Sequence, residues 1–474
     1  MIYRGFSTRL MWFLWIVVAL LALGRLGTVF SSVLLDYNEG WNAFQAAAAM
    51  GKGALYPPAN GFTANNYPPL SFYAVSFFSK FFGDLIVSGR IVSLISVIVV
   101  SGAIHAAIGR IVPERRIFPW LGCLIFLLFN VTVFRSYVAM NDPQWMGHAF
   151  MMAGVLALIW RAPEKRVPLP AIIMFSLMMF LGMLVKHNIV AIPLSVAIWL
   201  LSFDRRAFFI CLVMAILSVV AIAALDGLLF DGNMIASVIE FKRSYSLDRM
   251  LLHSLVAILF IPMTLCSGQL WHERRWDRRA GLLVIGIWVS LLLGVLQGSG
   301  SGVDINAYFE TLIFLSIACP VALALRSSSA WGRRFRFLLA LPLAILIPYG
   351  AVVSAGEIRG KAESVATAEA MISRIRMMPG PVACEDLALC YWAGKNFEVD
   401  FFSTRQKLAQ GEFRKRFHDA IANHDYSAIE MKNMMPGTDE NSVRMLISEH
   451  YHLLYERGDM GIYVPNLSGR MAGQ

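Results

Sequence analysis

Long apolar runs recur along the chain and are separated by shorter polar segments. Many of the runs have roughly 18–20 residues, the length of helix that the hydrocarbon core of a bilayer requires. The pattern predicts eleven membrane-spanning helices, at residues 10–34, 84–109, 117–134, 143–160, 168–185, 188–203, 207–225, 250–270, 280–296, 307–325 and 337–354. The first run is too long for a signal peptide and no small-residue cleavage site is evident, so we predict an uncleaved helix.

The polar connections differ in their content of arginine and lysine. The basic connections contain Arg110, Arg115 and Arg116; Arg161, Lys165 and Arg166; Arg205 and Arg206; Arg274, Arg275, Arg278 and Arg279; and Arg326, Arg333, Arg334 and Arg336. The other connections hold few basic residues for their length, and they are 35–83, 135–142, 186–188, 226–249 and 297–306. The positive-inside rule places the basic set and the N-terminus in the cytoplasm. An odd number of spans then places everything after about residue 355 outside.

The apolar stretch 67–82 is shorter than a span. Counting it as a span would place all later arginine-rich connections outside, against the charge rule. We therefore predict a helix that lies in the outer membrane interface, begun by Pro68 and Pro69 and rich in aromatic residues.

From Pro381 onward the apolar pattern becomes one of short strands and helices. The segments 382–384, 397–402, 426–429 and 461–464 predict strands, and 404–423 and 441–457 predict helices. This alternation indicates a small α/β domain with a mostly parallel sheet. No glycine-rich phosphate loop follows a strand, so nucleotide binding has no support. We divide the chain into a transmembrane domain, 1–355, and an extracytoplasmic α/β domain, 356–474.

The composition agrees with a polytopic α-helical membrane protein. Of the 474 residues, 57% are hydrophobic and only 15% are charged, whereas soluble domains carry about a quarter charged residues. The net charge of +10 is explained by the cytoplasmic arginines, so it predicts no nucleic-acid partner. Cys384 and Cys390 lie in the polar C-terminal region, where they form either a disulfide or a reduced pair.

Chemically distinctive polar residues gather in the outer connections. They are Asp36, Glu39 and Asn42; Tyr67; Arg135, Asn141 and Asp142; Lys186, His187 and Asn188; Lys242 and Arg243; and Asp304, Asn306 and Glu310. Lipid cannot satisfy polar side chains that continue into a span, so these groups predict one polar cleft that opens outward. Simpler interpretations stay open: 186–188 as a tight polar turn, 242–243 as solvated charges, and the acids of 36–39 as an ordinary loop.

Arg25 and Arg90 fall inside predicted spans near the outer leaflet. An arginine within the membrane is costly, so we expect each to have a functional partner. Extension of the side chain to the membrane surface is the alternative.

At these residues the chain resembles the polyprenyl-phosphate-dependent membrane glycosyltransferases of the GT-C fold, in the bacterial branch related to protein mannosyltransferases and the lipid A aminoarabinose transferase. The resemblance covers essentially the whole chain. It depends on the order and sidedness of Asn38-Glu39-Gly40-Trp41, Tyr67-Pro68-Pro69-Leu70, Asn141-Asp142-Pro143 and Lys186-His187-Asn188. Many relatives have adjacent Asp-Glu in the first loop, whereas Asn38 precedes Glu39 here and the aspartate lies earlier, at Asp36. Glu39 is therefore the first candidate for the family's acidic role.

The resemblance implies an inverting transfer of a sugar from a polyprenyl phosphate to a glycan, lipid or protein, at the periplasmic face of a bacterial inner membrane. The acceptor hydroxyl needs a base, which a carboxylate in a partly dry cleft can provide. We expect Glu39 to be this base, with Asp36 and Asp142 orienting the acceptor. Cations neutralise the leaving phosphate, and the candidates are Arg135, Lys186, Lys242 and Arg243. The other outer polar residues are expected to bind substrate.

Two other functions fit the same pattern. A transporter or flippase for a lipid-linked sugar would also use a polar cavity with cations, although the sequence has neither the repeats nor the midplane helix breaks typical of alternating access. A structural or regulatory membrane protein would leave the acidic first loop unexplained. The outer acids could also hold a divalent cation such as Mg²⁺ or Mn²⁺, but no ligand spacing is diagnostic.

Overall fold

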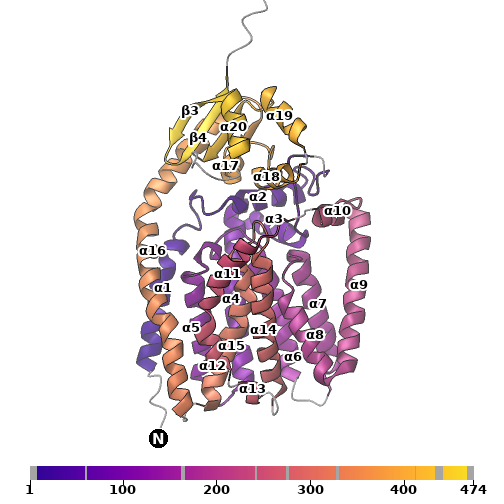
Figure 1. Cartoon of the computed structure of the whole chain (residues 1–474), viewed down its shortest axis with the longest axis vertical. Coiled ribbons are helices and arrows are strands. Elements are labelled where there is room, and N and C mark those ends of the chain that lie inside the picture. The colour runs from indigo at the N-terminus through magenta and orange to yellow at the C-terminus, as the bar shows by residue number, and fades with distance from the viewer. Residues whose placement is uncertain are drawn as a thin grey trace, which may run out of the picture.

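The computed structural model describes residues 8–58, 61–161, 166–240, 243–268, 270–273, 277–326, 330–411, 413–432 and 441–466. A bundle of helices forms the larger part, and a small domain with a four-stranded sheet covers one end of the bundle (Figure 1). The long elements of the bundle are α1 (Thr8–Leu26), α4 (Leu85–Ile111), α5 (Ile117–Val131), α6 (Gln144–Arg161), α7 (Leu169–Val185), α8 (Ala191–Phe203), α9 (Arg205–Leu229), α11 (Leu247–Ile258), α12 (Ile261–Ser267), α14 (Arg278–Gly298), α15 (Phe309–Arg326) and α16 (Ala330–Met377). The short ones are α2 (Tyr37–Ala49), α3 (Leu70–Phe82), η1 (Arg135–Tyr137), α10 (Asn233–Glu240), α13 (Leu270–Glu273) and η2 (Ile305–Tyr308).

The helices confirm a polytopic α-helical architecture. Within the described residues, 6 helices are long and apolar enough to cross a bilayer: α1, α4, α9, α14, α15 and α16. The predicted span 250–270 is instead a pair, α11 and α12, bent by 58°. The apolar helices α5, α7 and α8 lie in the same bundle but have only 15, 17 and 13 residues. The number of eleven spans therefore stays a prediction.

Burial differs sharply between the centre and the edge of the bundle. The apolar window of α15 is 94% buried, while that of α9 has no buried residue. α15 is therefore the central helix, and α9 stands at the edge with apolar side chains on every side (Figure 1). α3 lies at the covered end of the bundle beside α2. The sequence predicted this helix, and its place in the membrane interface stays a prediction.

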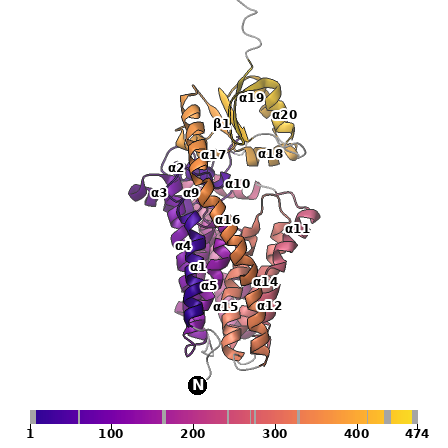
Figure 2. The same ribbon diagram turned by 90° about the vertical axis from the view of Figure 1, so that its left-hand side faces the viewer.

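One continuous helix joins the bundle to the small domain. α16 runs along α1 and continues up to the sheet (Figures 1 and 2). The predicted boundary at residue 355 falls inside this helix. Near this point Glu357 lies 3.2 Å from Nε of Arg25 and accepts a hydrogen bond of 2.9 Å from Nε of Arg135. These pairs fix α16 to the bundle, and they supply the acidic partner that an intramembrane Arg25 needs.

Aspartates mark the start of several helices. Asp36, Asp84, Asp204, Asp277, Asp386 and Asp400 each accept a hydrogen bond from a backbone amide in the first turn of the helix that follows. Such a cap satisfies an amide that has no partner within the helix. Capping alone explains an aspartate at these positions, so a chemical role needs further evidence.

The sheet of the small domain is mixed rather than mostly parallel, so that prediction was wrong. Its strands are β1 (Val382–Cys384), β2 (Ala428–Lys432), β3 (Tyr451–Arg457) and β4 (Met460–Pro465), in the order β1-β2-β4-β3. Only β1 and β2 pair in parallel; β2–β4 and β3–β4 are antiparallel. The helices of this domain are α17 (Leu387–Trp392), α18 (Phe401–Ala409), α19 (Arg414–Ala422) and α20 (Asn441–His450).

Three predicted elements of this domain were wrong. The segment 397–402 is no strand, because Asp400 caps α18 and the apolar residues after it pack as a helix. The predicted helix 404–423 is divided into α18 and α19 at Gly411, whose φ of +85° interrupts the helix. The predicted helix 441–457 ends at His450, and the rest pairs with β4 as an edge strand. A helix cap decided the first case, a glycine in the left-handed conformation the second, and pairing with β4 the third.

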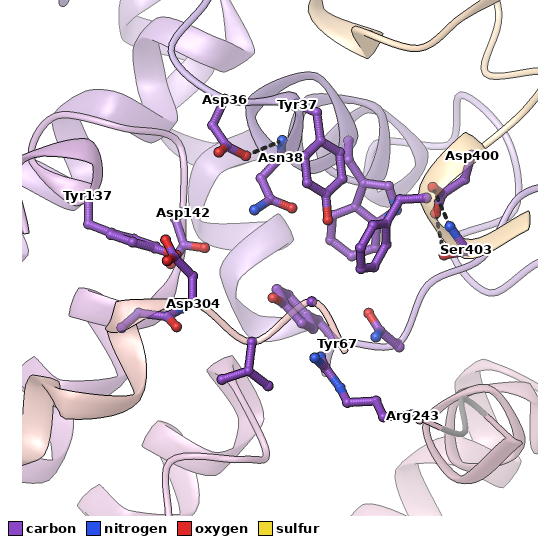
Figure 3. A pocket seen from close by; sticks show the side chains of 16 residues that line it. Asp36, Tyr37, Asn38, Tyr67, Tyr137, Asp142, Arg243, Asp304, Asp400 and Ser403 are labelled. Atoms are coloured by element: carbon purple, nitrogen blue, oxygen red, sulfur yellow. Dashed lines mark hydrogen bonds between the residues drawn. The ribbon is translucent and has the colours of Figure 1, made fainter. Parts of the chain in front are cut away.

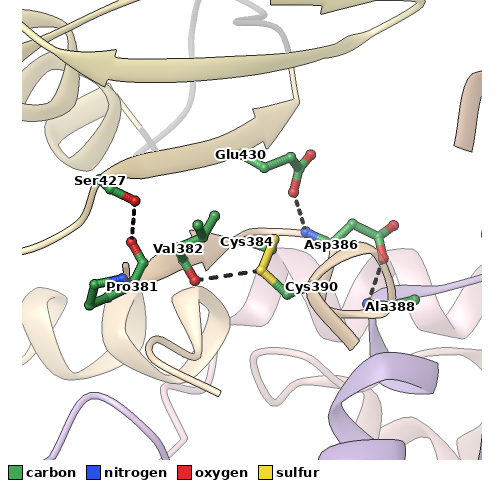
Figure 4. The surroundings of a disulfide bond; sticks show 8 residues. All are labelled: Pro381, Val382, Cys384, Asp386, Ala388, Cys390, Ser427 and Glu430. Carbon is green, nitrogen blue, oxygen red and sulfur yellow. Dashed lines mark hydrogen bonds between the residues drawn. A yellow bond between two sulfur atoms is a disulfide. The ribbon is translucent and has the colours of Figure 1, made fainter. Parts of the chain in front are cut away.

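The two cysteines of the small domain form a disulfide, Cys384–Cys390 (Figure 4). The sequence left open whether these cysteines form a disulfide or a reduced pair, and in the structure they form the disulfide. The disulfide closes the short segment between β1 and α17.

Candidate active site

A polar cavity of about 240 Å³ lies where the bundle meets the small domain (Figure 3). Its lining comes from stretches far apart in the sequence, and consists of Asp36, Tyr37, Asn38, Trp41, Asn66, Tyr67, Tyr137, Asp142, Arg243, Gly302, Val303, Asp304, Asn306, Asp400, Phe402 and Ser403. A concave site with several converging polar groups is the expected position of a binding site.

Asp36 lies at the N-terminus of α2 and lines the cavity. Its carboxylate accepts a hydrogen bond of 2.9 Å from the amide of Asn38. Burial is the main cause that raises the pKa of Asp36 to about 6, and the negative charges of Asp142 and Asp304 act in the same direction. At neutral pH this carboxylate is ionised and is a stronger base than an ordinary aspartate.

Asp142 lines the cavity from the turn before α6. One carboxylate oxygen accepts a hydrogen bond of 2.8 Å from the amide of Gln144, and the other lies 3.7 Å from Nζ of Lys186. The same Nζ donates a hydrogen bond of 2.9 Å to Oε1 of Gln144 and lies 4.9 Å from the centre of the Tyr67 ring. Lys186 is buried and does not line the cavity. It lies against the ring of Tyr67, which does line the cavity, and its positive charge balances that of Asp142.

Asp304 and Tyr137 form another polar part of the wall. The hydroxyl of Tyr137 donates a hydrogen bond of 3.0 Å to Asp304. The side chain of Asn306 donates a hydrogen bond of 2.8 Å to Oε1 of Gln144, and the backbone carbonyl of Asn306 accepts one of 2.9 Å from Nε2 of Gln144. These bonds fix the loop after α14 to the start of α6.

Arg243 supplies a cation to the cavity wall. Its Nη1 donates a hydrogen bond of 2.8 Å to the carbonyl of Ser301. Among the predicted phosphate ligands that the structure describes, Arg243 lines the cavity, whereas Lys186 and Arg135 do not. Lys242 lies outside the described residues.

The small domain closes the cavity with residues at the start of α18. The ring of Phe402 lies 5.3 Å from that of Tyr37. Gly302 leaves room for this ring, because a Cβ there would lie only 2.2 Å from it. The contribution of Phe402 to this wall was not predicted, because the apolar pattern of 397–402 favours a strand. The available signal was the spacing of Asp400 and Ser403, which is typical of a helix cap.

Glu39, the expected base, does not line the cavity. Its side chain is fully buried and pairs with the equally buried Arg90, with distances of 2.7 Å to Nε and 2.6 Å to Nη2 (0% exposed for both). The backbone amide of Asn141 also donates a hydrogen bond of 3.0 Å to the carboxylate of Glu39. Both oxygens accept hydrogen bonds from other groups of the chain, so Glu39 does not face the cavity in this structure, and its expected role as base stays a prediction.

Arg90 uses its other donors on the backbone. They reach the carbonyls of Thr28, Ser31 and Val33 at 2.8, 2.7 and 2.7 Å. The predicted first span ends early, at Leu26, and the chain beyond it wraps around this guanidinium. Arg90 thus has a partner, as the cost of a buried arginine requires, and the pair joins α2, α4 and the chain after α1.

Other predicted residues support the helices around the cavity. Asn42 donates a hydrogen bond of 2.8 Å to the carbonyl of Asn141, whose own amide group donates one of 3.0 Å to the carbonyl of Glu39. Glu310 accepts hydrogen bonds from the amides of Ala191 and Ile192, so it caps α8.

The turn between α7 and α8 contains the last two predicted residues, His187 and Asn188. The carbonyl of Asn188 accepts a hydrogen bond of 3.1 Å from Gln297. Neither side chain lines the cavity, and this placement favours the simpler interpretation of a polar turn.

In the part of the chain that the structure describes, no three side chains of His, Cys, Asp or Glu are placed to hold a metal ion together.

No protein-family model matches the chain, and no curated protein matches it in sequence. Solved structures do match in fold. ArnT from Cupriavidus metallidurans in the apo state superposes with a TM-score of 0.62 at 13% identity, over 96% of this chain and 98% of ArnT. ArnT bound to undecaprenyl phosphate gives 0.57 at 13%, over 95% and 98%. The archaeal oligosaccharyltransferase AglB from Archaeoglobus fulgidus, in complex with an inhibitory peptide and a dolichol-phosphate, gives 0.53 at 10%, over 97% and 75%.

ArnT is an aminoarabinose transferase, and both it and AglB have the GT-C fold. The likeness extends over nearly the whole chain, including the small domain. The protein therefore has the GT-C fold, as the sequence predicted.

The ion pair of Glu39 and Arg90 generates a prediction about stability. Glu39→Gln keeps the shape of the side chain but leaves a buried guanidinium without its counter-charge. Removal of one partner from a buried pair costs about 3–5 kcal/mol, so we expect a clearly lowered Tm of the purified protein in thermal unfolding.

The matched control is Asp36→Asn, which makes the same change of acid to amide one turn away. Asparagine caps a helix as well as aspartate does, so this variant should unfold within about 1 kcal/mol of the wild type. Equal stability of the two variants would contradict the structural role of Glu39.

Proposed function

We propose that the protein is a glycosyltransferase that moves a sugar from a polyprenyl phosphate to a hydroxyl group of an acceptor. The observation that carries the proposal is the position of Asp36, a carboxylate of raised pKa in the wall of a polar cavity at the end of a GT-C bundle. Structures of similar fold are bound to undecaprenyl phosphate or a dolichol-phosphate, which supports a donor of this class. The acceptor is a glycan, a lipid or a protein.

In the proposed reaction the acceptor oxygen attacks the anomeric carbon of the donor sugar. The bond from this carbon to the phosphate oxygen breaks, and its electron pair leaves with the phosphate. Asp36 takes the proton of the attacking hydroxyl, a role suited to a carboxylate whose pKa lies near neutrality. A single displacement of this kind inverts the anomeric centre. Asp142 and Asp304 orient sugar hydroxyls by accepting their hydrogen bonds.

The leaving group needs a cation rather than an acid. A polyprenyl phosphate departs as a phosphate monoester, which is an anion at neutral pH. The guanidinium of Arg243 in the cavity wall suits it, because its planar fork can donate two parallel hydrogen bonds to phosphate oxygens. Lys186 acts indirectly in this proposal, since it balances Asp142 from behind Tyr67.

An apolar groove suits the lipid tail of the donor. It has a volume of about 380 Å³ and runs between α7, α8 and α9. Ile222 of α9 lines the groove and also packs against the apolar cluster that holds Trp41 and Tyr67. Both aromatic residues also line the polar cavity. The cavity and the groove are therefore separated by this one apolar cluster, so the headgroup of a donor could occupy the cavity while its lipid tail occupies the groove.

The orientation in the membrane belongs to the same proposal. We place the N-terminus in the cytoplasm, and the cavity and small domain in the periplasm of a bacterial inner membrane. The first residues of α1 and the helix α13, which precedes an arginine-rich connection, lie at the end of the bundle opposite the sheet (Figure 1), in agreement with the positive-inside rule. The transporter alternative is not favoured, since the similar structures belong to transferases.

The first prediction concerns Asp36. Loss of a general base lowers the rate by roughly 10²–10⁴-fold, so Asp36→Asn should lower kcat within this range while the Kd of the donor changes only a few-fold. Since the base must be ionised, kcat/KM of the wild type should fall about tenfold per pH unit below pH 6 and be level above it. The rate of transfer of a radiolabelled sugar from purified donor, measured over a range of pH, gives kcat and kcat/KM.

The control is Asp204→Asn, which changes the aspartate that caps α9, far from the cavity wall. This variant should keep the wild-type rate and pH profile. Wild-type transfer by Asp36→Asn at every pH would show that the base lies elsewhere. Movement of the labelled lipid across vesicles without any transfer would favour the transporter.

The second prediction concerns the groove. Ala215 of α9 lines it, and Ala215→Phe should fill part of it. A phenyl ring in the groove would exclude about two methylene groups of the tail, each worth about 0.8 kcal/mol when buried, so we expect KM for a long-chain donor to rise about tenfold, with little change for a short-chain analogue. Ala224→Phe makes the same change on the opposite side of α9 and should leave both KM values unchanged. An equal rise of KM for the long-chain and the short-chain donor would show that the lipid tail does not bind in this groove.

The third prediction concerns sidedness. In protein that keeps Cys384–Cys390 but lacks the four free cysteines, a single cysteine at Gly51 or Gly411 should react with an impermeant maleimide added to intact cells. A cysteine at Glu114 should react only after permeabilisation. Labelling of Gly411 only after permeabilisation would place the small domain in the cytoplasm.

A further inference from the structure

α17 is the element of the small domain that contacts α2 most closely. A Cβ at Gly40 would lie 2.1 Å from the amide nitrogen of Ala388 and 2.2 Å from the carbonyl carbon of Leu387. No side chain fits there, so the two backbones touch directly, a contact that only glycine permits. Gly40 follows Glu39 and lies one turn after Asp36.

α17 also binds the start of α4. The hydroxyl of Tyr391 accepts a hydrogen bond of 3.0 Å from the amide of Leu85, and Nε1 of Trp392 donates one of 3.1 Å to the carboxylate of Asp84. α4 carries Arg90, whose partner Glu39 lies on α2. α17 therefore spans the two helices that share the buried ion pair.

The disulfide fixes α17 within its own domain. Cys384 ends β1 and Cys390 lies within α17, and both are buried. Between them the amide of Asp386 donates a hydrogen bond of 2.9 Å to Glu430 of β2, and the Asp386 side chain caps α17 (Figure 4). The segment that touches Gly40 is thus closed at both ends by one covalent bond.

We infer that the Cys384–Cys390 disulfide positions α2, and with it Asp36, by holding α17 in backbone contact with Gly40. Reduction by a dithiol, which supplies two electrons and two protons and leaves two thiols, releases this contact and lowers transfer. The two cysteines and Gly40 are positioning residues, and activity requires that the small domain be oxidised. The effect on transfer depends on the proposed function of Asp36, whereas the effect on α2 does not.

The first test is hydrogen exchange of the full-length protein. In Cys384→Ala/Cys390→Ala, and in wild type treated with a phosphine reductant, amides of the first turns of α2 should exchange at least about tenfold faster than in untreated wild type. Ile447→Ala is the control, since this core residue of the small domain packs in another cluster, with Phe417 and Tyr451. It should lower the Tm of the domain without faster exchange in α2. Unchanged exchange in α2 after confirmed reduction, or an equal rise in Ile447→Ala, would overturn the inference.

The second test separates positioning from stability by kinetics. Misplacement of a reacting group by about 1 Å can cost 10²-fold, so the reduced protein should show kcat lowered by about 10²-fold with donor KM changed only a few-fold. The acid limb of its pH profile should move below pH 6, because Asp36 becomes more exposed to water. Gly40→Ala should reproduce both effects with the disulfide intact. A rise in KM alone would overturn the inference. Full activity of Asp36→Asn would instead refute the proposed function and leave the exchange test to decide the positioning.

Discussion

The structure depends on one ion pair that is wholly removed from water. Glu39 and Arg90 are both fully buried, and every donor group of the guanidinium is directed at Glu39 or at carbonyls of the chain after α1. Either charge without the other would be strongly destabilising in this environment. The pair therefore fixes the end of α1, the first turn of α2 and α4 in one arrangement, and Asn141 adds the start of α6. The polar cavity is built on the helices that this pair holds.

The same short helix carries two acids with different surroundings. Glu39 faces inward to a permanent cation, while Asp36, one turn earlier, faces a cavity where burial, and after it the charges of other acids, raises its pKa. Environment divides the roles of paired carboxylates in many enzymes. Here the division follows from helical geometry, since side chains three residues apart lie near each other but need not face the same element. A structural acid beside the proposed base would explain why the segment 36–39 contains both.

Much of the bundle could be predicted because the relevant signals are local. Apolar length and arginine bias need no knowledge of packing, and they predicted a bundle of apolar helices and a set of polar residues, several of which line one cavity. The choice between Asp36 and Glu39 could not be predicted, because it depends on Arg90, which is 51 residues away in sequence from Glu39. The contribution of Phe402 was missed for a related reason: Asp400 and the apolar residues after it suit a strand or a capped helix equally well. Three tertiary contacts, with Arg90, Tyr37 and Gly302, decide what the sequence leaves open.

The burial of Asp36 is shared between the two parts of the molecule. Its own helix belongs to the bundle, but the wall around it is completed by Phe402, which packs on Tyr37 and over Gly302. Desolvation is the main cause of its raised pKa, and desolvation requires that water be excluded from both sides. The negative charges of Asp142 and Asp304, which belong to the bundle, raise this pKa further. The basicity that the proposed chemistry needs thus depends in part on the contact between the bundle and the small domain.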